Sequence, residues 1–280
     1  MTLLAHVSDL HLIEREHRKR TTFLRNRLKL LSFYAPDLDF ELRYRRVADA
    51  LNLIKEVGAD HVLVTGDLTE DGVEAQFEVL AEVLHNSGIA PERFTVVPGN
   101  HDGYDESGAW DRALAGPLRP FLSGSDLEPV VLAKAVVIPV STMIEDQHFI
   151  RAQGVVRHED MERIAKIYAT PEYSEHAIVV AQHHPPHRYL LPPLHWFDGV
   201  HNAKQMRQML LDRPRLHIAH GHLHYSVTRH LMHRPWPQLL CPYSIRDDHE
   251  HKEAVRFYKA ERGTLRAVSL EEARSYRRAV

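Results

Sequence analysis

The sequence predicts an α/β fold in which helices cover parallel strands and a later run of strands completes a second sheet. Two observations predict it. Short apolar segments alternate with longer segments in which apolar residues recur at helical spacing. After Gly221 this alternation gives way to closely spaced strand-like segments. Because no internal repeat or low-complexity linker interrupts this order, we expect one domain over residues 1–280.

Each element is predicted from its local pattern. Compact apolar segments predict strands at residues 3–7, 61–65, 94–97, 136–140, 177–181 and 216–219. Helical spacing predicts helices at residues 44–57, 73–84, 158–167 and 203–211, and Gly58 is a natural stop for the first of them. The run of strands after Gly221 is predicted at residues 227–232, 239–240, 255–258 and 265–270.

The composition is that of a globular protein and excludes several classes of function. Of the 280 residues, 44% are hydrophobic and 26% are charged, which is ordinary for a soluble domain. The net charge of −3 argues against a general binder of polyanions. No apolar stretch approaches the roughly 18 residues that a membrane-spanning helix needs. The first apolar segment lacks a basic region before it and is broken by His6, Ser8 and Asp9, so it predicts a strand rather than a signal peptide.

A single cysteine, Cys241, excludes an intrachain disulfide. This usage fits a reducing compartment, and we expect a cytoplasmic protein.

Polar side chains follow five of the predicted strands, at the point where each strand ends. These residues are Asp9 and His11; Asp67; Asn100, His101 and Asp102; His183 and His184; and His222 and His224. Ligands of open α/β sheets bind beyond the carboxyl ends of the strands, so all five groups are expected to converge there. Gly66, Gly99 and Gly221 precede three of the groups, where glycine permits a tight turn. Each group alone is common in unrelated proteins, and the prediction depends on all five together.

These residue types suit a pair of metal ions. Mixed carboxylate, amide and imidazole ligands favour Mn, Fe or Zn, in divalent or mixed-valence pairs, and require no thiolate. A carboxylate can bridge two cations, and two cations roughly 3.5–4 Å apart can stabilise both the attacking and the leaving oxygen of a phosphoryl transfer. A water molecule between them becomes a hydroxide at neutral pH, so no serine or cysteine nucleophile is needed. Most of the 22 histidines must nevertheless have ordinary structural positions.

The motifs D-x-H, GD, GNHD, H before HPP, and G-H-x-H together resemble those of the calcineurin-like metallophosphoesterase superfamily. The resemblance extends from Leu3 to about His224 and is closest to class III cyclic nucleotide phosphodiesterases and glycerophosphodiesterases. It implies a four-layer αββα sandwich. It further implies one metal ion held by Asp9, His11 and His224, a second held by Asn100, His183 and His222, and Asp67 bridging them. His101 would be the general acid or an electrostatic stabiliser, and Asp102 would orient its imidazole. The substrate would contact Asn100, His101, His11 and His224.

Two departures from the family bear on the substrate. Phosphoprotein phosphatases of the superfamily have a phosphate-binding arginine where this chain has Asp71, and an aspartate is expected to repel a phosphate dianion. This favours diesters. The second departure is a basic insertion at about residues 12–46, in which cations alternate with Phe and Leu. It is expected to be a solvated arm or homo-oligomer contact, a basic cap near the active site, or an element that contacts a membrane surface.

We therefore expect a dinuclear phosphodiesterase that hydrolyses a small diester, of the cyclic nucleotide or glycerophosphodiester kind, by attack of a metal-bridging hydroxide. The first alternative is a lipid-linked pyrophosphate or phospholipid hydrolase, peripheral on the membrane. The second is a nuclease, which the acidic net charge and the confinement of basic residues to one insertion disfavour. A scaffold that has lost catalysis is also disfavoured, because no expected ligand is missing.

Overall fold

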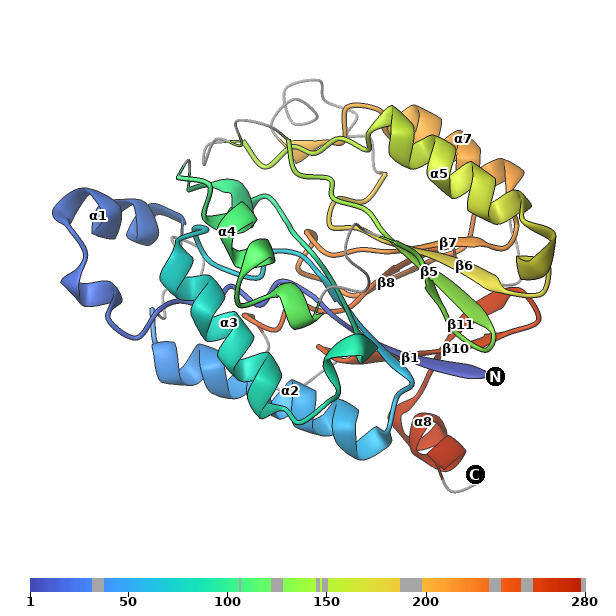
Figure 1. Ribbon diagram of the computed structural model, residues 1–280, viewed down its shortest axis with the longest axis horizontal. Helices are drawn as coiled ribbons and strands as arrows, with labels where there is room; N and C mark the ends of the chain where they lie inside the picture. The colour runs from blue at the N-terminus through green and yellow to red at the C-terminus, as the bar shows by residue number, and fades with distance from the viewer. Residues whose placement is uncertain are drawn as a thin grey trace.

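Two β-sheets lie face to face at the centre of the computed structural model (Figure 1). The structure describes residues 1–31, 38–105, 107–121, 128–144, 147, 151–186, 198–231, 238–247 and 254–277, without the side chains of 23, 24 and 277. The first sheet has the order β11-β10-β1-β2-β3, and the second has the order β4-β5-β6-β7-β9-β8. Strands β1, β2 and β3 are mutually parallel, as are β5, β6, β7 and β9.

The strands of the first sheet are β1 (Thr2–Val7), β2 (His61–Thr65), β3 (Phe94–Val97), β10 (Arg256–Glu261) and β11 (Thr264–Val268). Those of the second are β4 (Val130–Val131), β5 (Ala135–Pro139), β6 (Ala177–Ala181), β7 (Leu216–Ala219), β8 (Val227–Arg229) and β9 (Leu239–Cys241). The helices are α1 (Thr22–Leu31), α2 (Phe40–Val57), α3 (Glu74–Asn86), α4 (Ala109–Ala115), α5 (His158–Ala169), α7 (Ala203–Asp212) and α8 (Leu270–Arg277). Short 3₁₀ turns occur at His17–Lys19, Pro91–Arg93, His101–Gly103, Arg119–Phe121 and Pro171–Tyr173. Across these described ranges, no helix is long and apolar enough to cross a membrane.

Three separate apolar layers show that the fold is the expected four-layer αββα sandwich. Because side chains alternate along a strand, Leu3 and Val7 of β1 pack toward α2 and α3, whereas Leu4 packs between the sheets. In β5, Val137 lies between the sheets and Val136 packs toward α5 and α7. Figure 1 shows α2 and α3 on one side of the paired sheets and α5 and α7 on the other.

The first long helix begins earlier than its apolar spacing predicted. Asp39 accepts a hydrogen bond from the Leu42 amide at 3.1 Å and so caps a helix that starts at Phe40 rather than at residue 44. Gly58 ends it in the left-handed conformation (φ 75°), as expected. Residues 40–46, which the sequence assigns to the insertion, therefore belong to α2, and the insertion proper ends at the cap.

The strands after Gly221 are shared between the two sheets: β8 and β9 complete the second sheet, as predicted, whereas β10 and β11 extend the first. Strand β9 pairs in parallel with β7, whereas β10 pairs antiparallel with β1 and extends the first sheet. The alternating pattern identifies a strand but not its neighbour. In addition, Leu270 begins helix α8 rather than ending a strand.

Candidate metal centre

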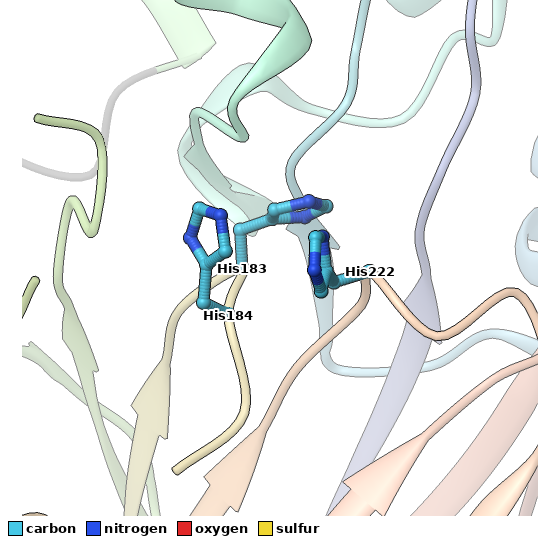
Figure 2. A group of neighbouring side chains, drawn as sticks. All are labelled: His183, His184 and His222. Carbon is cyan, nitrogen blue, oxygen red and sulfur yellow. The ribbon is translucent and has the colours of Figure 1, made fainter. Parts of the chain in front are cut away.

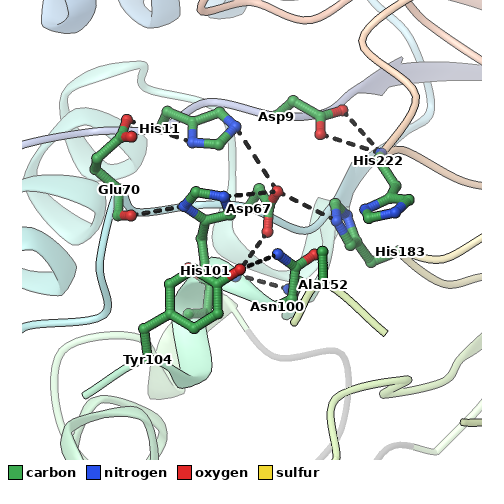
Figure 3. A network of polar contacts seen from close by, with 12 residues as sticks. Asp9, His11, Asp67, Glu70, Asn100, His101, Tyr104, Ala152, His183 and His222 are labelled. Atoms are coloured by element: carbon green, nitrogen blue, oxygen red, sulfur yellow. Dashed lines mark hydrogen bonds and ion pairs between the residues drawn. The ribbon is translucent and has the colours of Figure 1, made fainter. Parts of the chain in front are cut away.

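The predicted site lies where strands of both sheets end. The loops after β1 and β2 are joined by backbone hydrogen bonds from Asp9 N to Gly66 O at 3.1 Å and from His11 N to Asp67 O at 2.9 Å. The loop after β7 joins them, because the amide of His222 donates to Asp9 Oδ1 at 3.1 Å. Figure 3 shows side chains from these loops pointing toward Asp67. The two sheets thus contribute to one site.

The ligand loops have an unusual backbone. Among the described residues, six non-glycine residues have positive φ, and five of the six are predicted metal ligands. They are Asp9 (55°), His11 (48°), Asp67 (46°), His222 (73°) and His224 (56°). Each such residue costs on the order of 1–3 kcal/mol and persists only where the surrounding structure imposes it, commonly at functional sites. The strained backbone conformations therefore occur at the residues whose side chains are expected to converge on the metal centre.

One group of ligand atoms forms around Asp9. Single ligand atoms of Asp9, His11, Asp67 and His224 all lie within 4.8 Å of one another. The Nε2 atom of His224 is 3.3 Å from Asp9 Oδ1, and Nε2 of His11 is 3.7 Å from Asp67 Oδ2. The structure therefore brings together the three residues expected to hold the first metal ion and the residue expected to bridge.

A second group forms on the other side of Asp67. Nε2 of His183 lies 3.3 Å from Asp67 Oδ2, and the rings of His183 and His222 are 5.1 Å apart between centroids. Figure 2 shows these rings, from the loops after β6 and β7, close together, and their planes are 80° apart. Within the described part of the chain, Asn100 Oδ1 and His183 Nε2 are buried and have no hydrogen-bond partner. A cation would satisfy both atoms.

Asp67 occupies the position that a bridging ligand requires. Its Oδ2 atom faces His11 on one side and His183 on the other (Figure 3). Its Oδ1 atom accepts a hydrogen bond from the His101 amide at 3.0 Å. The close approach of Gly99 allows this, because a Cβ atom there would lie 2.3 Å from Asp67 Oδ1. Gly66 has φ 86° and is equally tight, since a Cβ atom there would lie 2.4 Å from His183 Nδ1.

The charges of the site also fit cations. Asp9 and Asp67 are almost completely buried. Although burial opposes it, Asp9 and Asp247 raise the pKa of His224 to about 10, and Asp67 similarly raises the pKa of His183 to about 9. The buried carboxylates of Asp9 and Asp67 thus favour the positively charged form of the neighbouring histidines. Metal ions can supply the compensating positive charge instead. Burial, together with Arg246, lowers the pKa of His11 to about 3, so its imidazole is neutral and able to bind a cation.

Comparison with known proteins agrees with this arrangement. The family model of the calcineurin-like phosphoesterases matches residues 2–226. The chain belongs to this family. Two partial relatives are a probable cyclic nucleotide phosphodiesterase of Psychrobacter arcticus, 27% identical over 64% of this chain and 61% of that protein, and another of a Psychrobacter species, 26% identical over 63% and 50%. The chain therefore spans less than two thirds of either relative. A dimetal phosphatase from Danio rerio is similar in fold, with a TM-score of 0.64 and 14% identity over 96% of this chain and 98% of that one.

In this calcineurin-like chain, the predicted partner of His101 is wrong. Asp102 does not orient the imidazole, because its carboxylate accepts hydrogen bonds from the amides of Leu68, Thr69 and Gly99 and from the Thr69 hydroxyl. Asp102 thus joins the loops after β2 and β3. Nδ1 of His101 instead donates to the carbonyl of Glu70 at 2.6 Å. This contact engages Nδ1 and not Nε2.

The four residues expected to contact substrate differ in their exposure. The side chains of His101 and His224 are 14% and 26% exposed, whereas His11 is fully buried and Asn100 is 1% exposed. Direct contact with a substrate from solvent is therefore open to His101 and His224. His11 and Asn100 are buried, so such contact is not open to them. Next to this group, His184 uses both ring nitrogens, on the Thr142 hydroxyl at 2.7 Å and the Ala152 carbonyl at 3.0 Å, so it supports the loop.

Sequence reasoning missed the acceptors behind the imidazoles. Glu70 Oε2 lies 3.4 Å from His11 Nδ1 without a hydrogen bond between them. Asp247 lies 2.6 Å from His224 Nδ1, and Asp198 lies 2.8 Å from His222 Nε2. His183 has a carbonyl instead, from Thr65 at 2.8 Å. Such acceptors fix the ring orientation and make imidazole a stronger ligand. Glu70 follows the GD motif and was detectable on that ground, but nothing in the local sequence distinguishes Asp198 or Asp247 from surface acids.

The structure also corrects the expected effect of Asp71. Its buried carboxylate does not present a free negative charge to substrate, because two insertion arginines neutralise it. Arg20 donates to both of its oxygens at 2.7 and 3.0 Å, and Arg27 donates to Oδ2 at 3.0 and 3.2 Å. This position still lacks an arginine that could bind phosphate. The prediction that Asp71 repels a phosphate dianion, however, is wrong.

Proposed function

We propose that this protein is a metal-dependent phosphoric ester hydrolase whose substrate is a small phosphodiester. The observation that supports it best is the position of Asp67 between two groups of ligand atoms, each suited to one cation. The partial relatives in Psychrobacter, which are described as probable cyclic nucleotide phosphodiesterases, favour a cyclic nucleotide among the diesters.

Two cations held there would activate a water molecule and neutralise charge on the phosphoryl oxygens. The chain's own residues would do the rest. Asp9, His11 and His224 would hold one cation, Asn100, His183 and His222 the other, and Asp67 would bridge them. Mixed oxygen and imidazole ligands favour Mn, Fe or Zn.

His101 is the proposed proton donor to the leaving oxygen. Its Nδ1 atom is engaged by the Glu70 carbonyl, so the ring has a fixed orientation, and its Nε2 atom lies 4.0 Å from Asp67 Oδ2 at the edge of the site. The ring of Tyr104 packs against it with 4.8 Å between centroids. A His101→Ala variant is expected to lose most activity on substrates with poor leaving groups and less on p-nitrophenyl esters, which leave without protonation.

The preference for a diester is supported by the missing arginine at Asp71. A bidentate guanidinium clamp suits the dianion of a phosphate monoester, whereas a diester has a single charge. Both arginines near this position donate to Asp71 itself. The substrate class is testable with a panel of cyclic nucleotides, glycerophosphodiesters, nucleotide-sugar lipids, phospholipids and p-nitrophenyl phosphate, each assayed with Mn²⁺.

The first experiment compares Asp67→Asn with Asp111→Asn in the hydrolysis of bis-p-nitrophenyl phosphate with added Mn²⁺. Both variants make the same chemical change, but Asp111 is an exposed residue of α4 outside the site. We expect Asp67→Asn to lose several orders of magnitude of activity and Asp111→Asn to lose none. Full activity of Asp67→Asn would contradict the bridging role, and absence of hydrolysis of every panel substrate with Mn²⁺, Fe²⁺ and Zn²⁺ would contradict the proposed function.

A further inference from the structure

The basic residues of the insertion divide into two sets, and the first set fixes the insertion to the rest of the protein. Arg20 and Arg27 donate to the Asp71 carboxylate, and their side chains are only 7% and 11% exposed. Arg15 forms a two-bond pair with Glu82 of α3, at 2.6 and 2.8 Å. Lys19 pairs with its neighbour Glu16. The described residues 15–27 of the insertion are therefore held against the rest of the protein by ion pairs of Arg15, Arg20 and Arg27 with carboxylates.

The second set has no such neutralisation. Within the described part of the chain, Arg18, Arg25 and Lys29 form no ion pair and line one groove of about 540 Å³. Leu28 and Leu38 contribute apolar wall to it, and its rim includes one carboxylate, Asp39. That carboxylate caps α2 by accepting from the Leu42 amide. The groove is thus lined by both cationic and apolar side chains.

The position of this groove separates it from the metal centre. Figure 1 shows α1 at one end of the molecule, outside the helices that cover the sheets. Arg25 and Lys29 are four residues apart on α1 and therefore lie on one helix face, where like charges repel and destabilise the helix. Next to Lys29, the side chain of Leu30 is 60% exposed. A ligand with both an anionic and an apolar part would reduce the repulsion between Arg25 and Lys29 and would cover Leu30.

We propose that this groove, together with Leu30, binds the surface of a phospholipid bilayer that contains anionic lipids. The phosphate groups of the lipids would lie between Arg18, Arg25 and Lys29, and Leu30 would enter the boundary between headgroups and acyl chains. Cations beside an exposed aliphatic side chain, here Leu30, are typical of an interfacial segment. A free phosphate ion would use the cations but not the apolar wall or Leu30, and a nucleic acid would need a longer basic surface.

The test is co-sedimentation of the full-length protein with large vesicles of phosphatidylcholine alone or with a quarter of phosphatidylglycerol. We expect binding to the anionic vesicles at 20 mM NaCl that is lost at 500 mM NaCl, because exposed charges are screened over a few ångströms at high salt. Reversing three surface cations (Arg18→Glu, Arg25→Glu, Lys29→Glu) is expected to weaken binding by at least about 100-fold, since each cation near an anionic surface contributes about fivefold. Leu30→Ser is expected to weaken it by about tenfold.

A matched control reverses three other exposed cations, Arg45, Lys55 and Lys204, and changes the net charge equally. It should bind like the unaltered protein. Equal losses in the two triple variants, or no binding to anionic vesicles at low salt, would overturn the proposal. Binding of an oligonucleotide that depends on the same three cations, without vesicle binding, would also overturn it. The unfolding temperature of each variant verifies that it is folded. Sedimentation with vesicles measures binding and not hydrolysis, so the outcome does not depend on whether the protein is a hydrolase.

Discussion

The hydroxyl of Tyr104 accepts a hydrogen bond from Asn100 Nδ2 at 2.6 Å, and this contact fixes which end of the amide remains for another partner. Asn100 Oδ1 is buried without a hydrogen-bond partner among the described residues. Tyr104 is itself 5% exposed, so the hydroxyl is held in place. Tyr104 is thus positioned to fix the orientation of Asn100, a proposed metal ligand, without itself being a ligand.

Tyr104→Phe should therefore weaken metal binding at the position expected to hold the second ion. Loss of a residue that orients a ligand typically costs about 10–100-fold in metal affinity. Calorimetric titration with Mn²⁺ measures this directly, and hydrolysis should recover at high Mn²⁺. Tyr173→Phe, on the far turn after α5, is the matched control. Unchanged affinity in Tyr104→Phe would show that the amide is oriented without the hydroxyl.

Asp247→Asn should weaken binding of the first ion. Asp247 lies 2.6 Å from His224 Nδ1, and an amide retains the size of the carboxylate but not the charge that strengthens the imidazole as a ligand. We expect a loss of about 10–100-fold in affinity, measured by competition with a chelator. Asp212→Asn makes the same change at an exposed residue of α7. Equal affinities in the two variants would exclude a role for Asp247.

Arg20→Ala should destabilise the fold and the attachment of the insertion. Asp71 is completely buried, and removing one of its two arginines leaves it partly uncompensated. We expect a loss of about 2–4 kcal/mol in the free energy of unfolding, measured with urea, since breaking a buried ion pair costs about 3–5 kcal/mol when no other partner is present. In a double-mutant cycle with Asp71→Ala, the coupling should exceed roughly 1 kcal/mol. Additive effects would contradict this anchoring contact.

Acid should destabilise the protein through His61, which begins β2 and is remote from the metal centre. Burial, with Arg93 nearby, lowers the pKa of His61 to about 4, below its ordinary value of about 6.5. The unfolded chain therefore binds a proton between these values that the folded protein does not. The stabilisation by neutral His61 is complete above pH 6.5 and is lost as the pH falls toward 4.

For this histidine the expected loss between pH 7 and pH 5 is about 2 kcal/mol in the free energy of unfolding. His61→Gln removes the titrating group but keeps a polar partner for the Thr95 hydroxyl, 2.7 Å away. Between pH 7 and pH 5, the free energy of unfolding of this variant should fall by about 2 kcal/mol less than that of the unaltered protein. Urea unfolding at the two pH values measures the difference. His158→Gln, at an exposed residue of α5, should behave as the unaltered protein. A His61→Gln variant with an unchanged pH dependence would contradict the assignment.

Local sequence determined the strands and the place of the seven expected ligands. Alternating or continuous apolar residues identify a strand, and a polar residue directly after it must lie at the sheet edge. Parallel strands share that edge, so Asp9, Asp67 and Asn100 had to be near one another once β1, β2 and β3 were parallel. These inferences need only neighbours in sequence and the regular geometry of a sheet.

Only the tertiary structure decided what stands behind the ligands. Asp247 reaches His224, and Arg20 reaches Asp71, through loops whose paths no local pattern specifies. The same holds for Asp102, which binds backbone amides instead of His101. A loop has no repeating geometry, so the partner of its side chains depends on the packing of the whole chain, and that packing also determined which sheet received β10.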